Sequence, residues 1–310
     1  MSARPNERLA YIGKCIYCGS DEDLTDEHML AAGFNGYYVL EDASCGVCAR
    51  ITSGMETKFL SATRTTRSAL GMGAKRRKTV ARTAPVWVTV KGVRQKEYLP
   101  VHESILPVLF PIFPRAGWAK GRAQSEALVV DQIPAVITFG KSPLEVMDRF
   151  GADQVSVDQP IPAVDFARLV AKTAYCYAVA KFGLDAFKNV GVLPAILGTA
   201  EDIGFWVGTF ARERPSSPDP TLIHRLNIGV LSNSADPSWD RMVTALVMLF
   251  ANAPAPVYEV VVGSLKPDVT IPPNVGVADL SQHQGEYIEP ETLDFWPNGA
   301  TVLGEPETRP

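Results

Sequence analysis

Two Cys-x-x-Cys pairs, Cys15–Cys18 and Cys45–Cys48, are separated by 26 residues near the start of the chain. Each pair has the spacing at which two thiolates chelate one tetrahedral ion, and four thiolates leave no open position for a substrate, so the expected metal is a structural zinc. The alternative, two disulfides, requires an oxidising compartment, whereas the polar stretch Met1–Arg8 lacks the apolar segment of a signal peptide. The sequence therefore predicts zinc bound by Cys15, Cys18, Cys45 and Cys48.

The stretch around these pairs resembles the zinc-stapled HNH endonucleases. The likeness rests on the order of its features: the first Cys-x-x-Cys pair, the segment Leu24-Thr-Asp-Glu-His28, a loop that contains glycine, the second pair preceded by Ser44, and then a helix. It covers about residues 12–70. The resemblance implies a ββα-metal fold, in which two antiparallel strands and a helix surround a catalytic divalent ion. It places the general base at His28 and ligands of the divalent ion at Glu27 and Glu56.

The chain departs from the family pattern at two places. Ala49 follows the last cysteine, where members commonly carry asparagine. After His28 the chain has Leu30-Ala31-Ala32-Gly33 and a lone Gly36, where members carry a proline and a Gly-Gly pair. The first departure is the main support for an alternative function, a module that kept the HNH frame and lost cleavage.

Hydrolysis of a phosphodiester requires a base for the attacking water and a cation beside the charge that develops on the phosphate. The imidazole of His28 titrates near neutral pH and suits the first task. Mg²⁺ or Mn²⁺ held by Glu27 and Glu56 would supply the second. Glu56 has a competing interpretation, because Ser53-Gly-Met-Glu56 fits a capping box, whose glutamate bonds back to the helix N-terminus.

Positive charge is concentrated in one segment of an otherwise acidic chain. Residues 50–82 contain nine Lys or Arg residues and one acid, a net charge of +8, which leaves −12 for the remainder of a chain whose total is −4. Such a segment is typical of a phosphate-binding surface, although Lys75–Lys78 alone also fits a solvated helix end. The expected partner is nucleic acid, DNA in the first instance and RNA as an alternative. Its backbone is expected to contact Arg50, Arg64, Arg67, Lys75, Arg76, Arg77 and Lys78.

The expected fold class is α+β: an N-terminal zinc-bound ββα-metal module, then a mixed region of antiparallel strands with one long covering helix. Within the module, strands are expected over 24–28 and 37–40 and a helix over 53–70. Cys176, inside the long helix, is expected to pack rather than to react. Periodicity and turn residues predict, further along, a hairpin over 86–98, a short helix between Ser142 and Gly151, the long helix over 164–182, and strands over 205–210, 226–231, 242–250 and 257–262.

Three parts follow from these elements: an HNH-like zinc module with its basic extension (1–82), a β-rich linker region (83–160), and an α+β C-terminal domain with a proline-rich tail (161–310). No apolar run reaches the length of a membrane span, so we expect a cytoplasmic protein without membrane contact. The function expected first is metal-dependent hydrolysis of DNA or RNA with His28 as general base. The alternatives are an inactive zinc-stabilised nucleic-acid-binding or scaffold module, and a C-terminal domain that senses a ligand.

Overall fold

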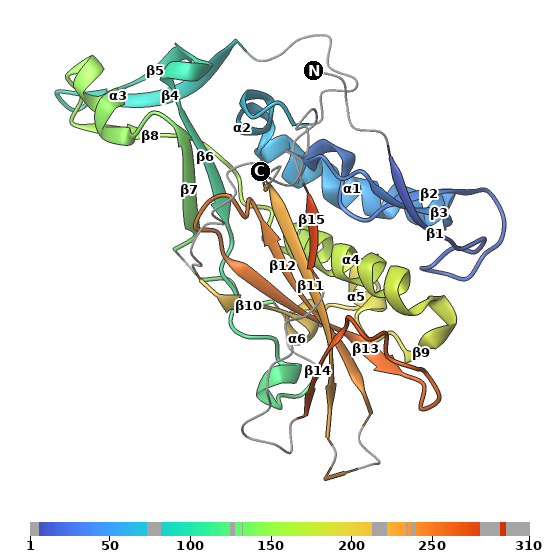
Figure 1. The fold of residues 1–310 in the computed structure, drawn as a ribbon. Coiled ribbons are helices and arrows are strands. Elements are labelled where there is room, and N and C mark those ends of the chain that lie inside the picture. The colour runs from blue at the N-terminus through green and yellow to red at the C-terminus, as the bar shows by residue number, and fades with distance from the viewer. Residues whose placement is uncertain are drawn as a thin grey trace, which may run out of the picture.

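The computed structural model describes residues 6–72, 82–124, 128–131, 133–212, 222–233, 235–236, 240–279 and 292–295. Figure 1 shows a main body in which helices lie on a twisted sheet, and a smaller lobe that projects from one side. The described part of the chain is mixed α+β with several largely antiparallel sheets. This is the class expected from the sequence.

The N-terminal part is a three-stranded sheet followed by two helices. β2 (Leu24–His28) pairs antiparallel with β3 (Tyr38–Cys45), and β1 (Glu7–Tyr11) pairs parallel with the other edge of β3. α1 (Gly46–Ala62) and α2 (Arg64–Ala69) come next in the chain. The predicted order of two strands and a helix is confirmed, and β1 is an additional strand.

α1 begins at Gly46, directly after β3, and not at Ser53. Ser53 lies inside the helix, where its hydroxyl donates to the carbonyl of Arg50. The predicted capping box at Ser53 is therefore wrong, and Glu56 is not a capping residue. Cys45 takes the N-cap position, so the second cysteine pair lies at the start of the helix.

The projecting lobe is built on a hairpin of β4 (Thr83–Val90) and β5 (Val93–Pro100). Lys91 and Gly92 form its turn with φ of 50° and 78°. A two-residue turn with both φ values positive has the type I′ geometry, whose twist matches that of the strands. The hairpin predicted from the sequence is confirmed.

The lobe is completed by α3 (Pro143–Phe150) and by β8 (Gln154–Ser156), which pairs with β4. Ser142 and Glu145 form a capping box at the start of α3, and Gly151 ends it in the left-handed conformation. The short helix predicted between Ser142 and Gly151 is therefore confirmed. The lobe has a small core of its own, made by Val86, Val88, Leu99, Ile105 and Val146.

β6 (Ile105–Phe110) and β7 (Ala135–Gly140) form an antiparallel pair between the lobe and the main body. The segment after β6 is tied to the main sheet by an ion pair in which Arg115 Nε lies 2.5 Å from Glu259 Oε1. The same carboxylate accepts the backbone N–H of Ala116. Short 3-10 helices cover Ala32–Phe34, Val101–Glu103, Trp118–Lys120 and Leu184–Ala186.

The main sheet has the order β10-β13-β12-β11-β14, with β9 paired to β13 and β15 paired to β11. Its pairings are antiparallel except that β14 runs parallel to β11. The strands are β9 (Phe187–Asn189), β10 (Val207–Ala211), β11 (His224–Ser232), β12 (Met242–Leu249), β13 (Val257–Leu265), β14 (Gly276–Asp279) and β15 (Thr292–Phe295). The helices of this part are α4 (Ala163–Phe182), α5 (Leu193–Leu197) and α6 (Ile203–Trp206).

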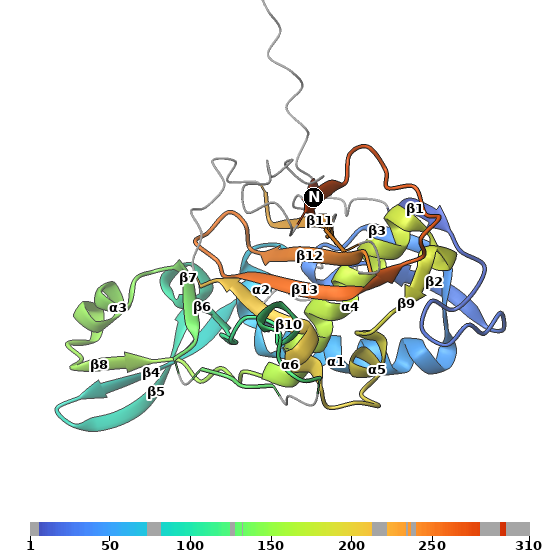
Figure 2. The ribbon, with the colours of Figure 1, turned by 90° about the horizontal axis from the view of Figure 1, so that it is seen from below.

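α4 lies between α1 and the main sheet in both views (Figures 1 and 2). Phe166 of α4 contacts Phe59 of α1, with ring centroids 4.7 Å apart, and Tyr258 of β13, at 5.0 Å. One hydrophobic core runs through these layers and contains residues from Cys15 to Val275. Residues of the predicted first and third parts therefore belong to the same core, and α4 is its central element.

Candidate functional site

The four cysteines of the two pairs converge on one point. Their sulfur atoms all lie within 4.8 Å of one another, and the Sγ atoms of Cys18 and Cys45 are 3.6 Å apart. Sulfurs bound to one tetrahedral zinc at about 2.3 Å would lie about 3.8 Å from each other. All four are free thiols rather than disulfides. The donor set and its spacing therefore fit a metal ion such as zinc, as the sequence predicts.

Turn geometry and a helix start hold the cysteines in place. Gly19 follows the first pair with φ of 78°, and its N–H donates to the carbonyl of Cys15, which closes the loop around the first two sulfurs. Cys45 ends β3 and Cys48 lies in the first turn of α1. The backbone N–H of Cys48 lowers the pKa of the Cys45 thiol to about 7, which favours its thiolate, the form that binds metal. Burial raises the pKa of the Cys48 thiol, so without metal the thiols of the cluster do not ionise together.

The loop of the first pair packs directly against α4. Tyr175 donates its hydroxyl to the carbonyl of Ile16 at 2.5 Å, and the hydroxyl of Tyr17 lies 3.6 Å from the sulfur of Cys176. Burial raises the pKa of Cys176 to about 12, so this cysteine stays a thiol. The expectation that Cys176 packs rather than reacts agrees with this position.

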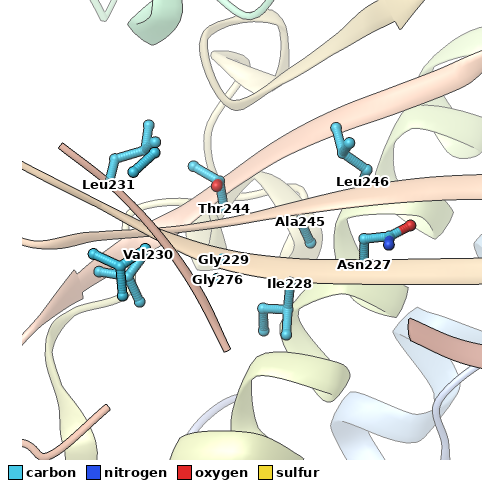
Figure 3. A pocket seen from close by; sticks show the side chains of 11 residues that line it. Asn227, Ile228, Gly229, Val230, Leu231, Thr244, Ala245, Leu246 and Gly276 are labelled. Atoms are coloured by element: carbon cyan, nitrogen blue, oxygen red, sulfur yellow. The ribbon is translucent and has the colours of Figure 1, made fainter. Parts of the chain in front are cut away.

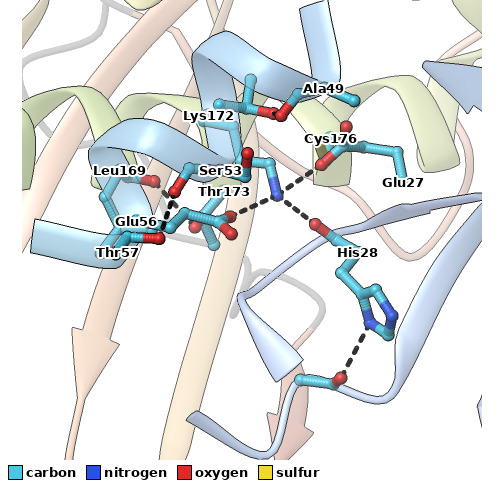
Figure 4. A network of polar contacts seen from close by, with 12 residues as sticks. Glu27, His28, Ala49, Ser53, Glu56, Thr57, Leu169, Lys172, Thr173 and Cys176 are labelled. Carbon is cyan, nitrogen blue, oxygen red and sulfur yellow. Dashed lines mark hydrogen bonds and ion pairs between the residues drawn. The ribbon is translucent and has the colours of Figure 1, made fainter. Parts of the chain in front are cut away.

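Lys172 of α4 lies between the two carboxylates of the site (Figure 4). Its Nζ is 2.7 Å from Glu27 Oε1 and 2.9 Å from Glu56 Oε1, and it also donates to the backbone carbonyl of His28. An ammonium group has three donors, and all three are used here. The side chain of Lys172 is 0% exposed, so it reaches these groups entirely within the core.

The ammonium of Lys172 is fixed in its charged form. Burial alone would lower its pKa, but the charges of Glu27 and Glu56 raise it above its ordinary value. A divalent ion held by both carboxylates would have to displace this ammonium, which α4 holds in place. The residues present therefore do not fit Mg²⁺ or Mn²⁺, and the predicted ligand role of Glu27 and Glu56 finds no support in their contacts.

The imidazole of His28 points away from Lys172 (Figure 4). Its Nδ1 lies 3.0 Å from the carbonyl oxygen of Gly36, which can only accept, so Nδ1 carries the proton and Nε2 is an acceptor. Gly36 is required at this place because a Cβ there would lie 1.7 Å from the carbonyl oxygen of Leu30. Burial and then the charge of Lys172 lower the pKa of His28. The ring is therefore a neutral proton acceptor near pH 7.

The residues expected to bind a phosphate backbone differ in their exposure. Arg50 and Arg64 are exposed on α1 and α2. Arg67 is buried, with 4% of its surface exposed, and donates to the carbonyls of Gly33 and Leu60 at 2.7 and 2.6 Å. The prediction of a phosphate contact is therefore wrong for Arg67, which holds the loop after β2 against the helices. The other predicted contacts, Lys75, Arg76, Arg77 and Lys78, lie outside the described residues.

A second histidine connects the same loop to the main sheet. Nε2 of His224 lies 2.9 Å from the carbonyl oxygen of Phe34, and its Nδ1 accepts the N–H of Phe250 at 3.2 Å. Burial lowers the pKa of His224 to about 3. His224 is a structural residue, and sequence patterns do not reveal its partner because Phe34 is far away in the chain.

The main sheet also carries a shallow hollow, between β11, β12 and β14 (Figure 3). The described residues that line it are aliphatic residues and two glycines, with Asn227 and Thr244 as the polar members. None of these lining residues is ionisable. The hollow therefore lacks the groups needed for acid–base or metal chemistry, and the candidate site remains the four-cysteine cluster together with Glu27, Glu56 and His28.

Comparison with known proteins gives no relative for this chain. No protein-family model, no curated protein and no solved structure matches it. Within the described ranges, no helix combines the length and the apolar character needed to cross a membrane.

Proposed function

We propose that this protein is a zinc-stabilised HNH-like module that binds nucleic acid and does not cleave it with a divalent ion. The observation that carries the proposal is the ammonium of Lys172 between Glu27 and Glu56. In an HNH nuclease, a divalent ion supplies the charge that stabilises the phosphate in the transition state. Here the lysine neutralises the carboxylates from inside the core, where it cannot reach a substrate. Ala49, in place of the usual asparagine, agrees with the same function.

The choice of nucleic acid as the partner rests on charge. The +8 segment of residues 50–82 lies within and directly after the HNH-like part of a chain that is otherwise acidic. Arg50 and Arg64 are exposed, so their charges are available to phosphates. Contacts of this kind grip the backbone without reading bases, and they weaken as salt rises because binding releases counterions. DNA is the first candidate and RNA the alternative.

A specific observation favours a second candidate, the endonuclease itself. The carbonyl of Gly36 fixes His28 in the tautomer that leaves Nε2 free to take a proton, which is what a general base requires. Cleavage would then need a cation held by groups other than Glu27 and Glu56, whose charges are neutralised by Lys172. His28 is thus the residue on which the two functions make different predictions.

Supercoiled plasmid separates the two functions. The purified protein is incubated with plasmid without metal, with Mg²⁺ and with Mn²⁺, and is compared with His28→Ala. The expected result is retarded migration of the plasmid that declines as salt rises, with no nicking under any of the conditions. Divalent-dependent nicking by the natural protein, reduced about a hundredfold or more in His28→Ala, would replace the proposal with the endonuclease. Nicking equal in both proteins would indicate a contaminant.

A further inference from the structure

The two faces of the β4–β5 hairpin have opposite character. Side chains alternate between the faces of a strand, so one face buries Val86, Val88 and Leu99 in the core of the lobe. The register places Trp87 opposite Lys96 and Thr89 opposite Arg94. The outer face therefore presents Trp87, Arg94, Lys96 and Tyr98 side by side. It lies on the lobe that projects from the main body (Figure 1).

Rings and cations alternate along this outer face. The guanidinium carbon of Arg94 lies 4.4 Å from the centroid of the Trp87 ring. The ammonium of Lys96 lies 5.6 Å from the centroid of Trp87 and 5.6 Å from that of Tyr98. Tyr98 is 63% exposed, so its ring is accessible to a ligand. The outer face therefore carries a strip of two rings and two cations, in which Arg94 lies over Trp87 and Lys96 lies over both rings.

Few acids oppose the positive charge of the strip. Asp158 lies 3.4 Å from Arg94, but both groups are more than half exposed, so the pair is weak and leaves the guanidinium available. Glu97 lies opposite Val86 in the register and therefore on the other face. The exposed Arg82, the last cation of the +8 segment, comes immediately before β4 in the chain.

We propose that the strip formed by Trp87, Arg94, Lys96 and Tyr98 binds single-stranded nucleic acid. A base stacks on the exposed ring of Tyr98, and Lys96 and Arg94, which lies over the ring of Trp87, meet the neighbouring phosphates. Stacking requires bases that are not already paired, so the strip selects single strands over duplex. The inference rests on the proposed function for its partner class and adds the form of the nucleic acid and the place where it binds.

Fluorescence anisotropy with labelled oligothymidine and with a labelled duplex tests this assignment. Tyr98→Ala is expected to lower the affinity for the single strand about tenfold and to leave the affinity for duplex unchanged. Tyr98→Phe retains the ring and is expected to bind like the natural protein. Arg94→Ala with Lys96→Ala should weaken single-strand binding and reduce its dependence on salt.

The matched controls are an exposed tyrosine and an exposed lysine on other parts of the surface. Tyr11 is 69% exposed and Lys188 is 55% exposed, and neither Tyr11→Ala nor Lys188→Ala is expected to change single-strand affinity. Melting temperatures confirm that each variant is folded. Because Tyr98 is exposed, its replacement removes a ring from the surface and not from the core.

Three results would overturn the assignment. Single-strand affinity that survives Tyr98→Ala places the contact elsewhere. Duplex binding without single-strand binding rejects the strip and leaves the proposed function standing, whereas binding to neither form rejects both. Binding of polyglutamate that Tyr98→Ala abolishes, in a protein that ignores oligothymidine, identifies the occupant as an acidic peptide.

Discussion

At the scale of the residue, Lys172 determines what Glu27 and Glu56 can do. A lysine buried to 0% exposure holds two carboxylates and a backbone carbonyl that belong to β2 and α1. Burial is tolerated because every donor of the ammonium has a partner. The two carboxylates, which the sequence suggests as metal ligands, thus connect β2 and α1 to α4.

Lys172→Met is expected to lower the free energy of unfolding by about 3–5 kcal/mol, because two buried carboxylates would lose their counter-charge. Urea titration measures the loss. Lys58 provides the matched control, since it also joins α1 to α4, through Asp165 at 2.9 Å, but is 62% exposed. Lys58→Met is expected to cost at most about 1 kcal/mol. Similar losses in the two variants would contradict a central role for Lys172.

Some of the residues of the candidate site can be predicted from the sequence, and others cannot. The cysteine cluster is predicted from spacing and residue type, and His28 is proposed from a resemblance that also rests on a local motif. Lys172 and Arg67 are paired with residues whose distance in the chain leaves no local pattern. A signal for Lys172 does exist: it is a lysine in the middle of a largely apolar helix, and a buried lysine requires acidic partners.

At the scale of the element, the loop of the first cysteine pair and α4 pack against each other. Ile16 and Tyr17 pack on Tyr175 and Cys176, so the metal site is part of the surface on which the central helix rests. Metal bound by four thiolates contributes on the order of 10 kcal/mol to the folding of a small module. Loss of the metal should therefore weaken the packing between α1, β3 and α4 first.

Metal analysis of the purified protein is expected to return one zinc per chain. Cys18→Ser should reduce the zinc content, and a chelator should increase hydrogen exchange in residues 12–70 before the main sheet opens. Cys176→Ser is the matched control, because Cys176 is a buried cysteine outside the four-sulfur cluster and its replacement should leave the zinc content unchanged. A protein without zinc, or with these cysteines in disulfides, would contradict the assignment.

The elements with strong local signals are the ones predicted well. α4 covers Ala163–Phe182 against a predicted 164–182, because nearly every turn of this helix is apolar and Gly183 ends it. The start of α1 is missed because a Ser-x-x-Glu pattern inside a helix looks like a cap. The strand expected over 205–210 begins as α6, where Trp206 bonds to Asp202, and becomes β10 only from Val207. Tertiary contacts, which local patterns do not contain, decide these boundaries.

At the scale of the whole molecule, His224 connects the loop after β2 to the main sheet. The neutral ring donates from Nε2 to Phe34 and accepts from Phe250 at Nδ1, so a second ring proton would place two N–H groups against each other. His224 therefore stays neutral in the folded chain, where burial lowers its pKa to about 3. Because the pKa differs between the folded and the unfolded chain, the contribution of His224 to the free energy of unfolding depends on pH.

Above about pH 6.5, the ordinary histidine value, the ring is neutral in both states and His224 contributes its full stability. As the pH falls below this value the unfolded chain binds a proton that the folded chain does not bind, so the free energy of unfolding falls by up to about 1.4 kcal/mol per pH unit.

Urea midpoints between about pH 7 and pH 5 measure this slope before most carboxylates titrate. His224→Gln keeps a donor for Phe34 and should flatten the slope. A residual slope of the same sign is expected from His28, whose pKa is also lowered. An unchanged slope in His224→Gln would show that the titration of His224 is not the cause of the pH dependence of the free energy of unfolding.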